Sequence, residues 1–170
     1  MSTSPQIVIQ DTCILLDLVE LNLLDDFFQS GYLVYSTPQV TSEITHENQW
    51  AKVEVHIING DLQIDDEGSI EAISLILEEN QALSFTDASV YELGLRKDAL
   101  ILSSDRSLRK CCEKGGLQVH GMLWIIEKLH AIGKIDCDGA CSCLEQYSSI
   151  NPWAPKTEIT KMISHLKSNR

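Results

Sequence analysis

The chain has 170 residues, of which 44% are hydrophobic and 22% are charged, and its formal net charge at pH 7 is −12. This composition is that of an ordinary globular protein and excludes a disordered or fibrous chain, and the length predicts one domain with a core of its own. No apolar run approaches the roughly 18 residues that a membrane span needs, and the N-terminus lacks the layout of a signal peptide, so we expect a cytoplasmic protein with free cysteine thiols.

The charges are unevenly distributed along the chain. Residues 1–95 contain 17 acidic residues and a single basic residue, Lys52, whereas residues 96–170 contain 12 basic and 8 acidic residues. Six of the 13 basic residues fall within residues 96–114. Either a local basic surface beside an acidic body or an ordinary solvated helix face explains this cluster.

Strand-like and helical segments alternate from the start of the chain. Residues 7–9 form an apolar run without helical periodicity, which is typical of a buried parallel strand, and residues 14–21 follow with helical spacing. Residues 32–35 predict a second strand. Thr37-Pro38 then supplies an N-cap and a proline at the first helical position, which predicts a helix through Ile44.

The middle of the chain continues the alternation. Residues 62–64 predict a short third strand, and residues 70–77 predict a helix that covers it. Thr86 is the expected N-cap of a further helix through Leu93, with Asp87 in its first turn. Residues 100–102 predict the fourth strand.

The last third of the chain becomes mainly helical. A helix through Leu108 and a fifth strand that ends at Val119 complete the alternating pattern. Residues 122–132 are strongly amphipathic and predict a long helix. Residues 134–170 predict two further helices, joined by the proline-containing loop at residues 151–155.

Strands that alternate with helices imply right-handed crossovers and a parallel sheet. We expect residues 1–135 to form a three-layer α/β/α sandwich whose mostly parallel sheet has about five strands in the order 3-2-1-4-5. Residues 136–170 are expected to form a helical extension packed on the same domain. Such sheets bind ligands beyond the carboxyl ends of their strands, so this edge is the expected site.

Four acidic residues are expected at this edge: Asp11, Glu43, Asp87 and Asp105. Asp11 ends the first strand, Asp105 follows the fourth, Asp87 begins the helix before the fourth, and Glu43 lies one turn into the helix after the second. Crowded carboxylates raise one another's pKa unless a cation lies between them. Oxygen ligands suit Mg²⁺ or Mn²⁺, which can promote in-line cleavage of a phosphodiester. Taken singly, all but Asp11 are more simply explained by capping, helix dipole or solvation.

The stretches around these acids resemble the four acidic motifs of PIN-domain ribonucleases. They are residues 7–15 (IVIQDTCIL), 37–44 (TPQVTSEI), 83–93 (LSFTDASVYEL) and 100–108 (LILSSDRSL), in this order and spacing. Residues 117–135 (LQVHGMLWIIEKLHAIGKI) are similar to a branch of the family in which the fifth strand ends in valine and glycine. The resemblance covers most of the chain and implies a PIN-like fold and an endoribonuclease that depends on Mg²⁺ or Mn²⁺.

The resemblance assigns metal binding and catalysis to the four matching acids, Asp11, Glu43, Asp87 and Asp105. Thr12 and Ser104 are expected to support them, and Ser104 could hold a water or a phosphate, because the family often has a small polar residue before the last acid. One departure is Cys13, which stands where the family commonly has Asn or Ser. Cysteine is a poor hydrogen-bond donor, so Asp11 would be oriented more weakly.

The resemblance also implies partners. These are RNA, a small antitoxin protein that restrains the enzyme as the toxin of a toxin-antitoxin pair, and a second copy in a homodimer. Arg106, Arg109 and Lys110 are the residues expected to contact RNA. Trp124 and Trp153 would suit an interface, but large aromatic residues are more often buried in the core.

Other functional classes fit the sequence poorly. A phosphoacceptor receiver domain would need a second acid beside Asp11 and a lysine where His120 stands. A haloacid-dehalogenase-like phosphatase would need a second aspartate two residues after Asp11, where Cys13 stands. A zinc protease would need histidine at Trp50, and the cysteines of residues 137–143 lack partners at zinc-ligand spacing. The alternative that stays open is a catalytically degenerate PIN-like module that binds RNA or a protein partner without cleavage.

Overall fold

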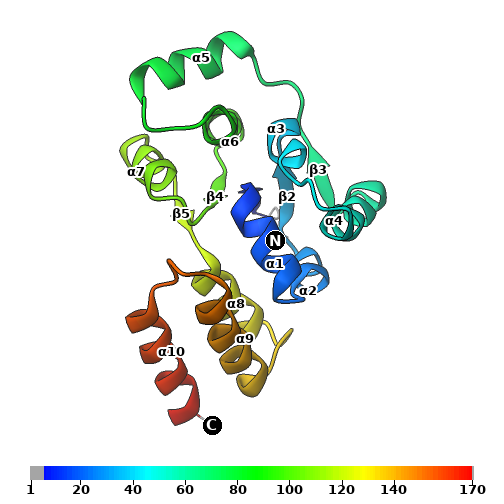
Figure 1. The fold of residues 1–170 in the computed structure, drawn as a ribbon, viewed down its shortest axis with the longest axis vertical. Helices are drawn as coiled ribbons and strands as arrows, with labels where there is room; N and C mark the ends of the chain where they lie inside the picture. The colour runs from blue at the N-terminus through cyan, green and yellow to red at the C-terminus, as the bar shows by residue number, and fades with distance from the viewer. Residues whose placement is uncertain (1–5, 170) are drawn as a thin grey trace, which may run out of the picture.

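The computed structural model describes residues 6–169 and has an α/β fold built around a parallel sheet (Figure 1). Its strands are β1 (Ile7–Gln10), β2 (Leu33–Ser36), β3 (Leu62–Ile64), β4 (Leu100–Leu102) and β5 (Val119–His120). They lie in the order β3-β2-β1-β4-β5, and every neighbouring pair is parallel. The α/β class expected from the sequence is confirmed, and all carboxyl ends of the strands meet at one edge.

Helices connect the strands and continue beyond the last one. They are α1 (Thr12–Glu20), α2 (Leu24–Phe28), α3 (Pro38–Ser42), α4 (Glu47–Asn59), α5 (Ile70–Glu79), α6 (Phe85–Lys97), α7 (Arg106–Lys114), α8 (Met122–Ala131), α9 (Cys137–Ile150) and α10 (Lys156–Ser168). Across residues 6–169, none of these helices has the length and apolar character needed to cross a membrane.

Helices α1 and α6 provide much of the buried surface next to the sheet. Ile14, Leu15 and Leu18 of α1 have no exposed area, as their helical spacing after the first strand predicts. Helix α6 packs against β1 and β4. Gly94 allows this close packing, because a Cβ atom at that position would lie 2.7 Å from Cδ1 of Ile101 in β4.

Among the helix ends that differ from the sequence-based expectation, those of α3 and α6 affect the position of an acidic residue. Helix α3 ends at Ser42, so Glu43 is its C-cap and not a residue inside a longer helix. Helix α6 begins after Ser84, and the predicted N-cap at Thr86 was wrong. Ser84 is the N-cap because its hydroxyl accepts the Asp87 N–H while the Asp87 carboxylate accepts the Ser84 N–H, which satisfies two otherwise unpaired donors.

The last three helices pack beside one another. Helix α8 contacts α9, and α9 contacts α10, at the end of the molecule opposite α5 (Figure 1). The loop between α9 and α10 carries Trp153, which is 90% exposed, against the general tendency of large aromatic residues to be buried. Trp124 in α8 is half-buried.

Candidate functional site

Asp11 lies at the point where β1 ends beside β4. Its backbone N–H donates to the Leu102 carbonyl at 3.2 Å, and its side chain is only 4% exposed. The Asp11 Oδ1 atom accepts the Ile14 N–H at 3.0 Å, so Asp11 is also the N-cap of α1. The adjacent Cys13 thiol donates to the same oxygen at 2.9 Å. This carboxylate is therefore held firmly at the carboxyl edge of the sheet.

The surroundings of Asp11 work against its negative charge. Burial raises its pKa to about 6, although hydrogen bonds from Cys13, Ser103 and Ile14 lower it, and the charge of Asp87 raises it further. Removing a carboxylate from water disfavours its ionised form, and a nearby like charge adds to that effect. Asp87 thus lies near enough to act on the Asp11 carboxylate, although the two residues are 76 positions apart in the sequence.

The other two acids lie beside the same edge, and each accepts a hydrogen bond. Glu43 Oε2 accepts the Thr12 hydroxyl at 2.5 Å, which links the end of α3 to the start of α1. Asp105 is the N-cap of α7, and its Oδ1 accepts the Leu108 N–H at 2.8 Å. The Ser104 hydroxyl lies 2.9 Å from the Cys13 thiol, so the segment after β4 touches the segment after β1.

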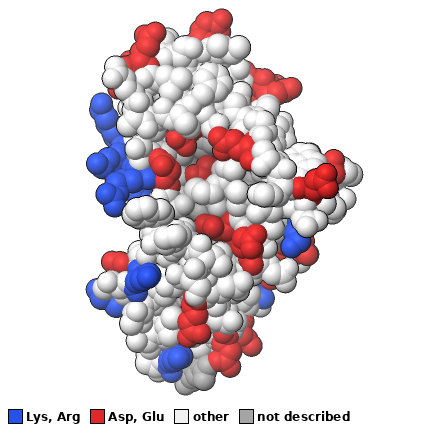
Figure 2. Space-filling view, in the orientation of Figure 1, with Lys and Arg blue, Asp and Glu red and all other residues white. Residues whose placement is uncertain are grey.

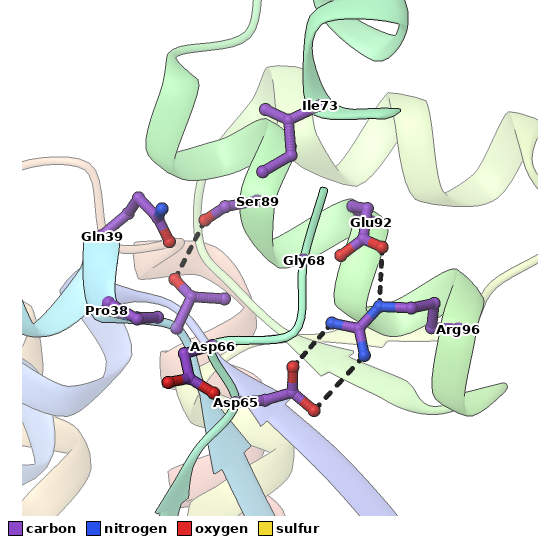
Figure 3. Close-up of a pocket in the computed structure, with 10 residues that line it drawn as sticks. Pro38, Gln39, Asp65, Asp66, Gly68, Ile73, Ser89, Glu92 and Arg96 are labelled. Atoms are coloured by element: carbon purple, nitrogen blue, oxygen red, sulfur yellow. Dashed lines mark hydrogen bonds and ion pairs between the residues drawn. The ribbon is translucent and has the colours of Figure 1, made fainter. Parts of the chain in front are cut away.

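Helix α6, which carries Asp87, is fixed by polar contacts with the segments that follow β2 and β3 (Figure 3). Arg96 binds Asp65 at 2.7 Å and Glu92 at 2.6 Å, and the hydroxyls of Thr37 and Ser89 are 2.9 Å apart. Glu92 is 6% exposed, and its Oε2 atom has no hydrogen-bond partner where it faces a cavity of about 40 Å³. These contacts set the position of the helix on which Asp87 depends.

The donor chemistry of this edge fits a hard divalent cation, because carboxylate and hydroxyl oxygens are what Mg²⁺ and Mn²⁺ bind. A cation would also offset the burial and repulsion that raise the pKa of Asp11. Within residues 6–169, however, no group of three or more His, Cys, Asp or Glu side chains is close enough to hold one metal ion. The edge therefore matches a divalent cation in ligand chemistry and in location, and each of the four carboxylates accepts a hydrogen bond within the protein.

Asp17 is a further acid near this site that the sequence reasoning missed. It is half-buried on α1, its Oδ2 atom has no hydrogen-bond partner, and burial together with the charges of Asp11 and Glu20 raises its pKa to about 6. The available signal was its spacing, because Asp17 follows Cys13 by four residues and so shares its helix face.

Beside the acids runs a groove of about 930 Å³, here called the aromatic groove. It is lined by Cys13, Ser104, Arg106, Trp124, Tyr147 and Trp153, among others. Of the three basic residues expected to contact RNA, Arg106 and Arg109 line the groove, whereas Lys110 is exposed outside its lining. Arg109 also donates to the carbonyls of Ser103 and Val119 at 3.3 Å each, so it helps to hold β4 and β5 together.

On one face of the molecule, some of the acidic and basic side chains gather in two neighbouring groups. Figure 2 shows acidic side chains gathered near the middle of one face and basic side chains gathered at its edge over α7. Of the basic residues within residues 96–114, Arg106, Lys110 and Lys114 are exposed, whereas Arg96 and Lys97 pair with Asp65. Both sequence-based explanations, a local basic surface and a solvated helix face, fit the exposed part.

Comparison with known proteins gives a family and a fold. A family model described as a PIN domain matches residues 7–168. The solved structure of PAE2754 from Pyrobaculum aerophilum is similar with a TM-score of 0.57 and 13% identity, covering 77% of this chain and 99% of that one. VapBC2 from Rickettsia felis, bound to a DNA fragment from its promoter, gives a TM-score of 0.49 and 12% identity over 68% of this chain and 98% of that one. No curated protein matches the chain.

Proposed function

Because the chain belongs to the PIN-domain family, we propose that it is a metal-dependent endoribonuclease that hydrolyses the phosphodiester bonds of RNA. The observation that carries the proposal is the position of Asp11. This buried carboxylate lies at the carboxyl edge of the sheet, and the charge of Asp87 contributes to its raised pKa. The adjacent Cys13 thiol contacts the Ser104 hydroxyl. Open parallel sheets bind their ligands at this edge.

On this proposal, the metal-holding residues are Asp11, Glu43, Asp87 and Asp105. A bound Mg²⁺ or Mn²⁺ would act as a Lewis acid and stabilise the negative charge that develops at the scissile phosphate. The chain's own polar residues act around it: Thr12 orients Glu43, and Ser104 can donate a hydrogen bond to a phosphate oxygen. Arg106, Arg109 and Lys110 attract the RNA backbone, which an acidic body would otherwise repel.

A second candidate function is a PIN module that binds RNA or a protein partner without cutting. It is favoured by one specific observation: within residues 6–169, the acids do not form a group of three or more metal ligands. It also gains support from Cys13, whose weakly donating thiol takes the place of the usual amide or hydroxyl beside Asp11.

Metal-dependent cleavage distinguishes the two functions. The purified chain should degrade a single-stranded RNA with Mg²⁺ or Mn²⁺ and should not do so in chelator. Asp11→Asn and Asp87→Asn should each lower the cleavage rate by more than the roughly 10- to 100-fold that follows the loss of a metal ligand's hydrogen-bond partner. Asp66→Asn, at an exposed acid with no part in the proposed site, is the matched control and should cleave normally.

Circular dichroism of each variant checks that folding is retained. Cleavage that persists in chelator, or in both site variants, would remove the proposed site. RNA binding without cleavage at any metal concentration would favour the non-catalytic module instead.

The wider biological setting is part of the same proposal. The motif resemblance supports a toxin that acts on cytoplasmic RNA, is restrained by a small antitoxin protein and assembles as a homodimer. Light scattering of the purified chain measures the homodimer directly, because a monomeric mass at micromolar concentration contradicts that part of the proposal.

A further inference from the structure

We propose that the aromatic groove binds nucleotides of single-stranded RNA beside the acidic site, with Trp153 as the side chain on which a base stacks. The identity of the ligand rests on the proposed function, but the geometry of the groove does not. Three features of the molecule support this role: the groove's continuity with the acids, the presentation of Trp153, and the local charge.

The inner end of the groove adjoins the carboxylates. Cys13 and Ser104 line it, and the Cys13 thiol contacts both the Ser104 hydroxyl and Asp11 Oδ1 at 2.9 Å. Asp105 lines the same groove. If a phosphate of a single-stranded RNA lies at these residues, the neighbouring nucleotides lie along the groove toward Trp153.

Trp153 is exposed but held in place by its loop. Its backbone N–H donates to Asn151 Oδ1 at 2.9 Å, and the Asn151 amide donates to the Tyr147 hydroxyl at 3.3 Å. The next residue, Ala154, is buried and donates to the Asn151 carbonyl at 3.0 Å. A 90% exposed tryptophan on a fixed loop offers a flat aromatic face at little further entropic cost, which is what base stacking needs.

Two other aromatic side chains of the groove lining, His120 and Trp124, are already stacked on each other. The rings of His120 and Trp124 are 4.8 Å apart and nearly parallel at 4°, and Lys128 lies over the Trp124 ring at 5.5 Å. Burial and the charges of Arg109 and Lys128 lower the pKa of His120, which favours the uncharged ring. Trp153 is then the aromatic side chain that remains available to a base.

The charged side chains of the groove lining suit the phosphates of RNA. Arg106 lines the groove from the first turn of α7, and Asp105, the N-cap of that helix, is the carboxylate beside it in the lining. Arg109 lies in the same lining. The guanidinium groups of Arg106 and Arg109 can each pair with phosphates, which an RNA backbone carries at regular spacing.

RNA binding in EDTA tests this inference without cleavage. The probe is a fluorescein-labelled single-stranded RNA 12-mer of mixed sequence, followed by anisotropy with the intact chain. Trp153→Ala should raise the Kd about 5-fold or more, since loss of one stacked base typically weakens binding by at least that factor. Trp153→Phe should restore most of the affinity, and wild-type tryptophan fluorescence should fall on binding. Ile58→Ala, at a 77% exposed residue of α4 away from the groove, is the control and should bind as the wild type does.

The outcomes separate this inference from the nuclease proposal. Weaker binding by Trp153→Ala supports the groove even if the wild type never cleaves RNA with Mn²⁺, in which case the nuclease proposal alone fails. If the wild type cleaves RNA with metal but Trp153→Ala binds RNA as tightly as the wild type does, the inference about the groove is overturned and the nuclease proposal stands. A change in molecular mass of Trp153→Ala by light scattering, with RNA affinity unchanged, overturns it in favour of a contact between copies.

Discussion

Asp11 and Cys13 form a pair whose properties depend on each other. Burial and the adjacent Asp11 charge raise the pKa of the Cys13 thiol well above its usual value, so the thiol keeps its proton at neutral pH. That proton is the one donated to Asp11 Oδ1. The residue that departs from the family pattern therefore still supplies a hydrogen bond to the carboxylate, although a thiol is a weaker donor than a hydroxyl or an amide.

The unpartnered carboxylate of Asp17 makes stability depend on pH. Its pKa is raised to about 6 in the folded chain, against about 3.9 for an unfolded aspartate. Between these values the folded state binds more protons than the unfolded state, so this group lowers stability progressively as pH rises from about 4 through 6. Above pH 6 the ionised carboxylate opposes folding to its full extent.

Asp17→Asn should therefore stabilise the chain at pH 8 and leave it nearly unchanged at pH 4. A shift of this size, discounted for the partial exposure of the side chain, corresponds to about 1–2 kcal/mol at pH 8. Thermal unfolding at both pH values measures the difference, with Asp66→Asn as an exposed control. An equal change in Tm at pH 4 and pH 8 would show that the charge of Asp17 is not the cause.

At the scale of elements, the contact between α6 and β4 depends on the absence of a side chain. A Cβ atom at Gly94 would lie 2.7 Å from Cδ1 of Ile101 and 3.1 Å from Cδ1 of Leu117. Both neighbours are buried, so neither can move into solvent. The helix that carries Asp87 therefore approaches the sheet at the closest distance that its sequence allows.

Gly94→Ala should destabilise the chain, because overpacking a core costs about 1–3 kcal/mol and exceeds the roughly 0.5–1 kcal/mol that alanine contributes to a helix interior. Urea unfolding measures the loss. Ile101→Val removes the Cδ1 atom nearest to the new methyl group, so it should cost less in the Gly94→Ala background than in the wild type. Additive effects of the two substitutions would contradict the proposed steric conflict.

The strands and helices that the sequence predicts differ in their apolar pattern from those that it does not predict. Strands β1 and β4 are continuous apolar runs, and α8 places apolar residues on one face, so the sequence reveals all three. Helix α4 buries only Val53 and His56, which leaves little periodic signal. The end of α3 was predicted too late because an apolar residue, Ile44, follows the C-cap and extends the pattern past the helix.

At the scale of the whole molecule, the sequence could predict which edge of the sheet the acids share but not how each side chain is oriented there. Parallel pairing brings the residues that follow β1 and β4 together whatever the side chains do. The hydrogen bonds of Glu43 with Thr12 and of Asp87 with Ser84 depend on rotamers and helix ends. The sequence named Trp153 as a residue that would suit an interface but could not predict its exposure, because this depends on the packing of α9 and α10, which no local pattern reveals.

The division of charge between the two parts of the chain has a consequence for RNA binding. A body with net charge −12 repels a polyanion, so attraction must come from the few basic residues over α7. Binding to single-stranded RNA releases counterions, so the logarithm of the binding constant decreases as the logarithm of the salt concentration rises. The slope of this line becomes shallower by roughly 0.7 for each phosphate that the protein no longer neutralises. RNA affinity should therefore depend on a small number of side chains, and its salt dependence should weaken when they are removed.

Arg106→Gln combined with Lys110→Gln should thus weaken RNA binding and flatten its salt dependence, by roughly 0.7 in slope for each of the two side chains that neutralises a phosphate in the wild type. The matched control is Lys134→Gln combined with Lys167→Gln, which removes the same charge from exposed positions outside α7. Anisotropy titrations in EDTA between 50 and 200 mM salt, roughly the range over which such interactions dominate affinity, measure both slopes. If net charge alone governs binding, the two double variants will lose affinity equally; if the surface over α7 is the RNA-binding surface, only the first will.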